Sequence, residues 1–474
     1  MAEIITSDLC VIGGGSAGLT IAAGASQMGA KTVLIERGTM GGDCLNDGCV
    51  PSKSLLAAAR AADAIRRAGA FGIRIGLPAV DFAAVHRHVH GVIAAIAPND
   101  SVERFTGLGV QVIQEAARFT GPDEVAAGTH RIRARRFVIA TGSSAFVPPI
   151  PGLGETPYLT NETVFDLTAC PRHLIIIGGG PIGCELAQAH RRLGSDVTIV
   201  EMANILPKDD PELVEIVRTG LRADGVAIKE GSRVLKVERR GENVAVHVQC
   251  HGRESWIEGS HLLLAVGRRA NVGNLGLETA GIAYSPQGVT VDARLRSTNR
   301  RVYAAGDAAG GPQFTHIASH HAGIILRNAL FRMPAKVDLR ALPWVTFTDP
   351  EIAQVGLAER AARERHGAIR ILRWPFADND RAQTERTIEG LAKVITDSRG
   401  RILGAAIVGP HAGELIQMWG LAITGRMRIG TIAGMIAPYP TLGEINKRVA
   451  GSYFTPKLFS ERTRRLVRFL LRFG

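Results

Sequence analysis

Two cysteines near the start of the chain offer the clearest chemistry, in the stretch GGDCLNDGCVPSK at residues 41–53. Cys44 and Cys49 are five positions apart, so a regular helix would place them well off a common face. The flanking glycines permit a tight, irregular turn that would bring the two Cα atoms to disulfide distance, roughly 4.4–6.8 Å. We interpret the pair as a redox-active disulfide that opens and re-forms.

Cys49 is expected to begin a helix that runs on through Pro51, where unpaired N–H groups and the helix dipole favour a thiolate. The alternatives are a structural disulfide and a zinc pair. The spacing exceeds that of a zinc knuckle, and no second Cys/His pair completes a metal site. With six cysteines and no signal-peptide pattern before the first strand, we expect a reducing, cytoplasmic compartment. We expect the other cysteines to be buried packing residues: Cys10, Cys170, Cys184 and Cys250.

The length and composition indicate a globular protein of several domains. A chain of 474 residues is too long for one core and predicts about three domains. No apolar run approaches the roughly 20 residues that a bilayer span needs. The net charge of +12 is uneven, and no nucleic-acid motif with interleaved aromatic residues accompanies it, so we exclude a nucleic-acid partner.

A dinucleotide-binding fingerprint precedes the cysteines. Residues 7–36 read as a short apolar strand, the triplet Gly13-x-Gly15-x-x-Gly18, a helix of small residues and a second strand that closes at Glu36. The glycines suit the turn, the approach of the backbone to a pyrophosphate, and helix–strand packing, while the acid suits a ribose hydroxyl.

The same pattern recurs at residues 174–201, with the triplet Gly178, Gly180 and Gly183 and with Glu201 at the end of the second strand. Two such βαβ units predict two bound dinucleotides. Glu201 would repel a 2′-phosphate, which favours NADH over NADPH, although Lys208 lies within loop reach.

Two further strand ends carry glycine-rich turns. ATG at 140–142 closes a strand over 136–140, and AAGDAAG at 304–310 follows another, so that Asp307 meets the sheet edge where ribitol or pyrophosphate would bind. Either could also be an ordinary turn. We place these residues among the cofactor contacts: Thr141, Gly142, Gly267, Asp307 and His316.

Together these motifs resemble the pyridine nucleotide–disulfide oxidoreductases of the dihydrolipoamide dehydrogenase, glutathione reductase and mercuric reductase group, over roughly residues 5–455. The resemblance implies an α/β fold with two Rossmann-like domains, for FAD and NAD(P), plus a C-terminal α+β dimerisation domain, working as a homodimer. The implied boundaries are 1–150 and 271–338 for the FAD domain, 151–270 for the NAD(P) domain, 339–455 for the dimerisation domain and 456–474 for a tail.

The resemblance also implies roles for individual residues. The first fingerprint and Asp307 would bind FAD, and the second would bind the nicotinamide nucleotide. Cys44 would be the interchange thiol that faces substrate, and Cys49 the thiolate against the flavin. Lys53 and Glu185 stand where a lysine–glutamate pair tunes the flavin. Electrons would pass from NADH through the flavin to the dithiol and then to an acceptor.

The chain departs from the disulfide-reducing members near its end. Their His-Pro-Thr segment, followed by a glutamate, is here APYPTLGE at 437–444, with Tyr439 in the place of the histidine and Glu444 after it. A tyrosine, with an ordinary pKa near 10, is a poor proton shuttle at neutral pH. Mercuric reductases are similar in having a tyrosine here, and our prediction is a reductase of that mercuric-like branch.

Two observations complicate a mercuric assignment. No cysteine follows Cys250, so the vicinal pair that passes Hg(II) inward in that group is absent, and the sequence contains no CxxC motif. Asp43 also stands where threonine is common, and a carboxylate beside Cys44 disfavours its thiolate. The acceptor, a metal ion, quinone or disulfide, therefore stays open. The alternatives are a dihydrolipoamide dehydrogenase and a non-enzymatic flavin-bound redox sensor.

Two groups of histidines invite a metal reading. On a helix, His86 and His90 share a face while His88 points away, so we expect a solvated face and no metal site. We expect the same of His320 and His321.

The segment 455–474 extends beyond the family core. Arg464, Arg468 and Arg472 recur at helical spacing opposite an apolar side of leucines and phenylalanines. The pattern predicts a short basic amphipathic helix, which either makes weak contact with an anionic membrane surface or else packs on the dimer or frays in solvent.

Overall fold

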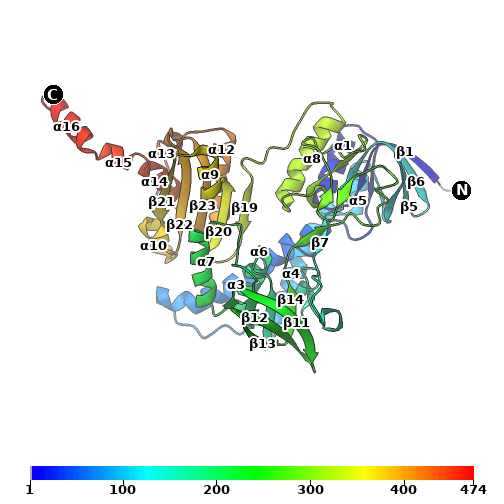
Figure 1. Cartoon of the computed structure of the whole chain (residues 1–474), viewed down its shortest axis with the longest axis horizontal. Helices are drawn as coiled ribbons and strands as arrows, with labels where there is room; N and C mark the ends of the chain where they lie inside the picture. The colour runs from blue at the N-terminus through cyan, green and yellow to red at the C-terminus, as the bar shows by residue number, and fades with distance from the viewer. Residues whose placement is uncertain (1–2, 474) are drawn as a thin grey trace. The chain divides into compact units, whose positions relative to one another are not determined.

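The computed structural model describes residues 3–473. The chain forms two compact units (Figure 1). Unit 1 comprises residues up to 178, 189–202 and 232–337, and unit 2 comprises 179–188, 203–231 and the chain from 338 onward. The domain boundaries that the sequence predicts remain a prediction.

A seven-stranded sheet organises the first part of unit 1. Strands β3, β2, β1 and β6 lie parallel in that order, and β18 runs parallel to the second half of β6. The antiparallel hairpin β4–β5 pairs with the first half of β6. The strand bounds are β1 Glu3–Ile12, β2 Thr32–Ile35, β3 Val110–Ile113, β4 Ala117–Gly121, β5 Glu124–Ala127, β6 His130–Ile139 and β18 Val302–Ala304. Parallel strands that end together bring the loops after β1, β6 and β18 to one edge.

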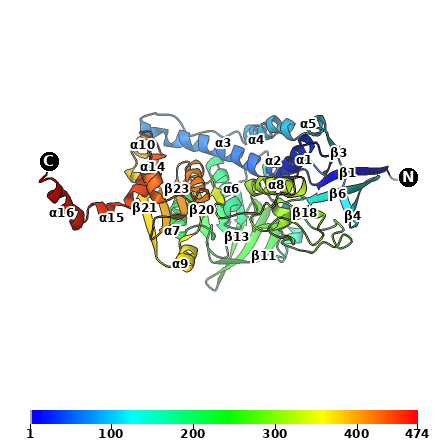
Figure 2. The ribbon, with the colours of Figure 1, turned by 90° about the horizontal axis from the view of Figure 1, so that it is seen from above.

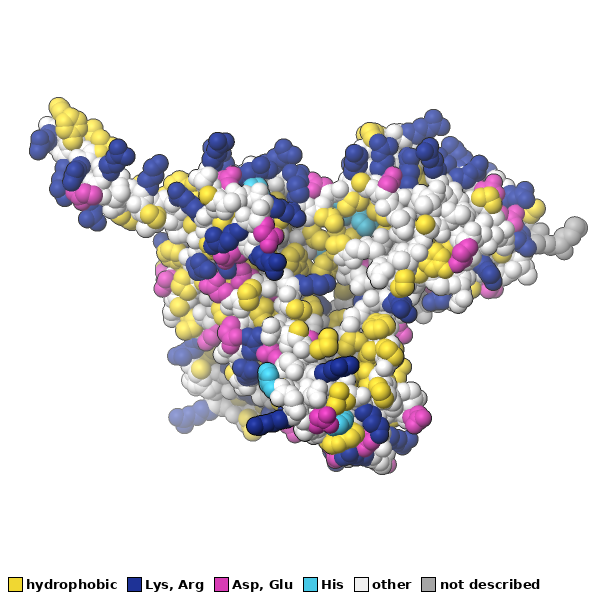
Figure 3. Space-filling model, in the orientation of Figure 1, with side chains coloured by type: hydrophobic (Ala, Val, Ile, Leu, Met, Phe, Trp, Pro, Cys, Tyr) yellow, Lys and Arg dark blue, Asp and Glu magenta, His cyan; other side chains and the backbone are white. Residues whose placement is uncertain are grey.

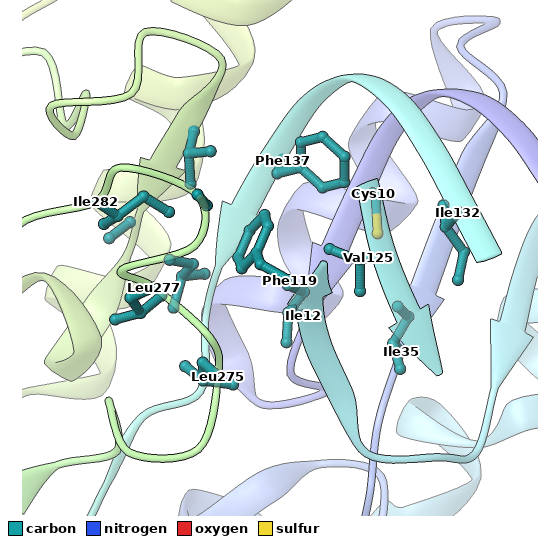
Figure 4. Close-up of a cluster of buried hydrophobic side chains, with 14 of the residues drawn as sticks. Cys10, Ile12, Ile35, Phe119, Val125, Ile132, Phe137, Leu275, Leu277 and Ile282 are labelled. Atoms are coloured by element: carbon teal, nitrogen blue, oxygen red, sulfur yellow. The ribbon is translucent and has the colours of Figure 1, made fainter. Parts of the chain in front are cut away.

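Both faces of this sheet are buried, as expected for parallel strands covered on two sides. Leu9 and Val11 of β1 face the helices α1 (Ser16–Gln27) and α8 (Thr315–Ala329), which pack on each other (Figure 2). Cys10 and Ile12 face the opposite way, where Phe119, Phe137 and segment 275–282 close a second core (Figure 4). The alternation of β1 side chains between the two cores fixes the register of the sheet.

Unit 1 also contains the second fingerprint strands. A parallel sheet contains β9, β8 and β14 in that order. An antiparallel sheet contains β11, β12 and β13, which lie between β9 and β14 along the chain. The bounds are β8 His173–Ile177, β9 Asp196–Val200, β11 Ser232–Arg240, β12 Asn243–Cys250, β13 Arg253–Gly259 and β14 His261–Leu264. The helix between β8 and β9, α6 (Pro181–Leu193), is divided between the two units.

The remaining elements of unit 1 are short strands and the helices that follow the cysteines. The strands are β7 Ser143–Ala145, β15 Arg268–Ala270, β16 Tyr284–Ser285 and β17 Gly288–Val289. The helices are α2 Gly42–Asn46, α3 Cys49–Arg67, α4 Phe82–Ile96 and α5 Val102–Gly107.

A five-stranded antiparallel sheet, in the order β19-β20-β23-β22-β21, forms the centre of unit 2. Its core includes Trp419, whose indole N–H donates to Asn446 Oδ1 at 2.7 Å. The strands of this sheet are β19 Pro343–Thr346, β20 Glu351–Gly356, β21 Ile369–Pro375, β22 Leu391–Asp397 and β23 Ile402–Gly409. Unit 2 also contains the short strand β10 Ala227–Lys229, which is not part of this sheet. The helices are α7 Pro211–Ala223, α9 Glu359–His366, α10 Asp380–Glu385, α11 Ala412–Leu415, α12 Gln417–Thr424, α13 Ile429–Ala433, α14 Glu444–Ser452, α15 Thr455–Leu458 and α16 Glu461–Leu470. The predicted fold class, α/β with a C-terminal α+β part, is confirmed.

Candidate functional site

The two cysteines of the 41–53 segment lie on two consecutive helices. Cys44 is on α2, and Cys49 is the first residue of α3, with Gly48 between the helices as the N-terminal cap. The two thiols are hydrogen-bonded to each other. The hydroxyl of Thr315, the first residue of α8, lies 3.3 Å from Cys44 Sγ and 3.5 Å from Cys49 Sγ. The predicted helix start at Cys49 is confirmed, and Thr315 is a neighbour that the sequence did not indicate.

The turn between the cysteines is more regular than expected, because Cys44 sits in a short helix rather than in an irregular loop. Glycine is needed at the first position of this helix. Gly42 has φ +60°, and a Cβ there would lie 2.8 Å from Gly15 Cα. The first fingerprint and the cysteine segment therefore approach each other closely at their backbones.

The environment separates the proton affinities of the two thiols. The hydrogen bond from Cys44 lowers the pKa of Cys49 to about 6, assisted by Thr315 and the nearby charge of Lys53 and opposed by burial and Asp43. The same hydrogen bond, together with burial, raises the pKa of Cys44 far above its ordinary value. At neutral pH the reduced pair is thus a thiolate at Cys49 and a thiol at Cys44.

The carboxylate of Asp43, which precedes Cys44, is paired. Its Oδ1 lies 2.9 Å from Arg268 Nη2 and accepts a hydrogen bond from Asn161 Nδ2 at 2.8 Å. Asn161 also binds the backbone carbonyl of Asp47 at 3.1 Å. We expected Asp43 to oppose a thiolate at Cys44. In the structure its charge raises the pKa of Cys49.

Asp307 is held at the turn after β18 by the same arginine. Ser143 Oγ donates to Asp307 Oδ2 at 2.6 Å, and Arg268 Nε donates to Ser143 Oγ at 2.8 Å. Burial raises the pKa of Asp307, while Ser143 and Arg268 lower it. Thr141 Oγ1 donates to the carbonyl of Asn271 at 2.6 Å, which ties the ATG turn to the strand that carries Arg268.

The first glycine triplet has the geometry that a dinucleotide needs. Gly13 has φ +110°, and a Cβ there would lie 2.4 Å from the carbonyl oxygen of Ala140, while a Cβ on Gly18 would collide with Gly13. Glu36 follows β2 and accepts hydrogen bonds from the N–H groups of Gly14 and, at 2.7 Å, Gly38. These residues fit an adenine dinucleotide with its pyrophosphate at α1 and its ribose at Glu36.

The second triplet repeats this geometry. Gly178 has φ +113°, and a Cβ there would lie 2.3 Å from the carbonyl oxygen of Ala265, whereas Gly180 faces open space. Gly183 lies on α6, and Glu201 directly follows β9. Gly142 and Gly267 also have positive φ and open space beside them. The binding roles of these positions stay predictions.

Lys53 and Glu185 belong to different units. Lys53 lies on α3, where its ammonium group donates to Ser52 Oγ at 3.3 Å. Glu185 is buried on α6, and its Oε1 accepts a hydrogen bond from the backbone N–H of Phe347 at 2.9 Å. The pairing of the two side chains remains a prediction.

Tyr439 and Glu444 lie near the C-terminal end of unit 2. Tyr439 is 67% exposed, and its hydroxyl donates to Asp380 Oδ2 at 2.9 Å. The carboxylate of Asp380 raises the pKa of Tyr439 above its ordinary value. Glu444 begins α14 and pairs with Arg448 at 2.7 Å. Tyr439 is therefore an even weaker proton acceptor at neutral pH than a free tyrosine.

Within residues 3–473 no group of three or more His, Cys, Asp or Glu side chains gathers in a way that could hold a metal ion. His86 and His90 stack on α4 with ring centroids 4.2 Å apart, and His88 is exposed, as predicted. His316 is exposed and stacks on Phe314. The prediction is right for the exposed His320.

The prediction of a solvated face is wrong for His321. This side chain is 5% exposed, and its Nδ1 accepts a hydrogen bond from the N–H of Gly306 at 3.2 Å. Burial lowers the pKa of His321 to about 4, so the imidazole is neutral and supports the turn that carries Asp307.

The prediction that the other four cysteines are buried packing residues is right for two of them. Cys10 and Cys184 are buried, but Cys170 and Cys250 are half-buried. Cys170 lies beside the hydroxyl of Ser195 at 3.2 Å, and Cys250 is the last residue of β12. Strand ends and loops leave part of each side chain in solvent.

Comparison with known families decides what this arrangement is. Residues 7–322 match the model of the pyridine nucleotide-disulphide oxidoreductases, and residues 342–450 match the dimerisation domain of the same family. The chain belongs to this family. Its members act as oxidoreductases with FAD and a pyridine nucleotide, and the dimerisation domain supports a homodimer.

Several curated members of this oxidoreductase family match over most of the chain. The mercuric reductase of Streptomyces lividans is 36% identical over 454 residues, which is 94% of this chain and 96% of that protein. The mercuric reductase of Bacillus cereus is 35% identical over 92% of this chain and 70% of that protein. The dihydrolipoyl dehydrogenase of Bacillus subtilis (strain 168) is 33% identical over 92% of this chain and 96% of that protein.

Solved structures of similar proteins superpose on this chain over most of its length. The Cu(II) complex of the HOCl-induced flavoprotein disulfide reductase RclA from Escherichia coli superposes with a TM-score of 0.85 at 28% identity, covering 94% of this chain and 99% of that chain. LpdA from Mycobacterium tuberculosis gives a TM-score of 0.86 at 29% identity with the same coverage. The family and fold inferred from the sequence motifs are confirmed.

Proposed function

We propose that this oxidoreductase is an NADH-dependent reductase of the mercuric-reductase-like branch, with Cys44 and Cys49 as its redox pair. The observation that carries the proposal is the divided pair of thiols, a thiolate of low pKa at the start of α3 and a protonated partner on α2. Such a pair is suited to cycling between dithiol and disulfide.

Bound FAD would carry two electrons from the nicotinamide nucleotide to the cysteine pair. On reduction the S–S bond breaks and the pair takes up two electrons. Because the pKa of Cys49 is about 6 and that of Cys44 is raised, one proton is taken up near pH 7 and it resides on Cys44. Returning the electrons to an acceptor re-forms the disulfide and releases that proton.

The acceptor must therefore react with the protonated thiol of Cys44 without the help of an efficient base, because Tyr439 cannot take up the thiol proton at neutral pH. A thiophilic metal ion meets this requirement, because binding of a soft cation displaces the thiol proton without a separate base. The names of the relatives support this class: four are mercuric reductases, and a structural neighbour was solved as a Cu(II) complex. Quinones and small disulfides are the other acceptor classes within the proposal.

NADH is the proposed donor because Glu201 stands at the ribose end of the second fingerprint, where its carboxylate would repel a 2′-phosphate. Lys208 is exposed and is the cation that could offset this repulsion. We propose a cytoplasmic location, since cycling of this dithiol needs reduced pyridine nucleotide and a reducing compartment.

The test is anaerobic NADH consumption by purified FAD-loaded protein with Hg(II), Cu(II), quinones, lipoamide and glutathione disulfide as separate acceptors. We expect turnover with a metal ion or quinone that is lost in Cys44→Ser and Cys49→Ser, and slower turnover with NADPH. Cys170→Ser is the matched control, because this half-buried thiol lies outside the 41–53 segment. Equal turnover by wild type and both serine variants would refute the redox role of the pair.

A dihydrolipoamide dehydrogenase is the second candidate, favoured by the relatives of that name in Bacillus subtilis and Thermus scotoductus. Tyr439 argues against it, and fast lipoamide-dependent turnover by the wild type would establish it. The third alternative, a non-enzymatic redox sensor, has no support from the relatives, which are enzymes.

A further inference from the structure

The C-terminal tail, defined here as residues 456–473, contains a helix whose apolar side chains are not packed against the rest of the protein. Helix α16 has no buried side chain. Six basic residues and one acidic residue lie between Lys457 and Arg472. The match to the dimerisation domain ends at residue 450, so the tail lies outside the part of the chain that matches this domain.

The start of α16 is specified locally. Ser460 caps the helix by accepting a hydrogen bond from the N–H of Thr463 at 3.3 Å, and Thr463 Oγ1 donates to the carbonyl of Lys457 at 2.7 Å. Glu461 in the first turn suits the helix dipole. A ten-residue helix is nonetheless marginal in water on its own, so an external surface would have to stabilise it.

One side of α16 is apolar and open to solvent. Leu466 is 55% exposed, Leu470 57% and Phe473 74%, and the ring of Phe469 contacts that of Phe473 with centroids 5.0 Å apart. Their spacing of three and four residues places these side chains on one face. Exposed apolar faces of this kind indicate a binding surface.

The opposite side of α16 is basic. Arg464 and Arg468 on α16 and Arg472 just after it follow one another at four-residue intervals, and Arg465 beside them forms an ion pair with Glu461 at 3.5 Å. Figure 3 shows dark-blue basic side chains and yellow apolar side chains, both exposed, on the C-terminal tail. Arginines that flank an apolar stripe can reach lipid phosphates while leucine and phenylalanine enter the acyl boundary.

We propose that the C-terminal tail binds reversibly to the surface of an anionic phospholipid bilayer, with α16 lying in the plane of the interface. Charge complementarity selects this occupant, because both the apolar face and the arginine face are satisfied at once only by an apolar layer bordered by negative charge. No helix among residues 3–473 is long and apolar enough to cross a membrane, so the contact is peripheral. This inference does not depend on the identity of the electron acceptor.

The test is flotation of the FAD-loaded full-length protein with phosphatidylcholine vesicles, with and without phosphatidylglycerol. We expect binding only to the anionic vesicles, and its loss near 1 M salt, where the Debye length is about 3 Å. Arg464→Gln with Arg468→Gln should weaken binding about twenty- to thirtyfold, at roughly tenfold per 1.4 kcal/mol and about 1 kcal/mol per basic residue. Leu470→Asp should abolish binding.

The matched control is Arg360→Gln with Arg365→Gln, which removes the same charge from α9, another exposed helix of unit 2. This control should bind as the wild type does. Leu466→Trp gives an independent readout, with a blue-shifted emission on anionic vesicles. Equal flotation of the wild type and a chain ending at Thr455 overturns the proposal. So does a tail-dependent increase in oligomeric size without vesicle binding, which would assign the apolar face to a second copy.

Discussion

Arg268 forms an ion pair with Asp43, the residue that precedes Cys44, with Nη2 2.9 Å from Oδ1. The guanidinium group is mostly buried and also donates to Ser143, which in turn donates to Asp307. Burial raises the pKa of Asp47 to about 6 and also raises that of Asp307, and the charge of Arg268 opposes both shifts. One buried cation therefore serves the carboxylates of the cysteine turn and the carboxylate of the turn after β18.

Removing this cation should weaken the thiolate at Cys49. In Arg268→Gln the charge of Asp43 is no longer balanced, and because a nearby anion disfavours a second anion, the pKa of Cys49 should rise above about 6. The measurement is the pH dependence of iodoacetamide labelling at Cys49 in the reduced protein, located by mass spectrometry.

Asp43→Thr is the opposite change and should lower the pKa of Cys49. The double variant with Arg268→Gln should return the labelling profile close to that of the wild type. An unchanged profile in Arg268→Gln would mean that solvent screens Asp43 in place of the arginine.

Thr315 should control the same titration from the other side. Its hydroxyl lowers the pKa of both Cys44 and Cys49, so Thr315→Val should shift Cys49 labelling to higher pH at nearly constant volume. Thr315→Ser keeps the hydroxyl and should preserve the profile. Ser319→Ala, one turn further along α8, tests for a general disturbance of the helix and should have no effect.

Local sequence signals predicted the parts of this site that depend on neighbours in the chain. The glycine triplets, the strand ends at Glu36 and Glu201 and the helix start at Cys49 all follow from backbone requirements within a few residues. The burial of His321 could also have been predicted from the sequence. This residue falls in the apolar stripe of α8 with Ala318, Ala322 and Ile325, and that pattern indicates a buried position.

Contacts across long stretches of chain had no such signal. Thr315 meets Cys44 across 271 residues and is set by the packing of α8 rather than by any local pattern. Arg268 follows a glycine at a strand start, where an arginine is usually solvated, and only the paired strands β7 and β15 bring it to Ser143. The ion pair with Asp43 could not be read from the sequence for the same reason.

A buried lysine that pairs with three carboxylates in unit 2 should contribute strongly to the stability of that unit. Lys393 Nζ lies 2.7 Å from Asp210, 3.0 Å from Glu212 and 3.0 Å from Glu359, with its side chain 4% exposed. Lys393→Met leaves three carboxylates with one cation fewer, and we expect a loss of about 3–5 kcal/mol in the free energy of unfolding. Thermal or urea unfolding measures it.

Lys236→Met is the matched control for this cluster, since Lys236 forms an exposed pair with Glu238 and should cost about 0–1 kcal/mol. The pH dependence has a defined sign. Arg373 first, and Lys393 with it, lower the pKa of Glu212 to about 2, so its contribution to stability is complete above the ordinary value and is lost as the pH falls toward 2. The difference between wild type and Lys393→Met should therefore shrink in acid.

Replacing Tyr439 tests what limits the choice of acceptor. Asp380 holds the pKa of Tyr439 above its ordinary range, so the phenol stays protonated at neutral pH and cannot serve as a base there. Tyr439→His supplies a base near neutrality, and we expect lipoamide and glutathione disulfide reduction to rise roughly tenfold or more, within the range of general acid–base catalysis. Asp380 favours the charged imidazolium, so adding Asp380→Asn should move the optimum of this new activity to lower pH.

Tyr439→Phe separates this effect from metal handling, because it removes the hydroxyl without adding a base. If Tyr439→His gains nothing with either disulfide while its metal-dependent turnover persists, proton transfer at this position is not what excludes disulfide substrates.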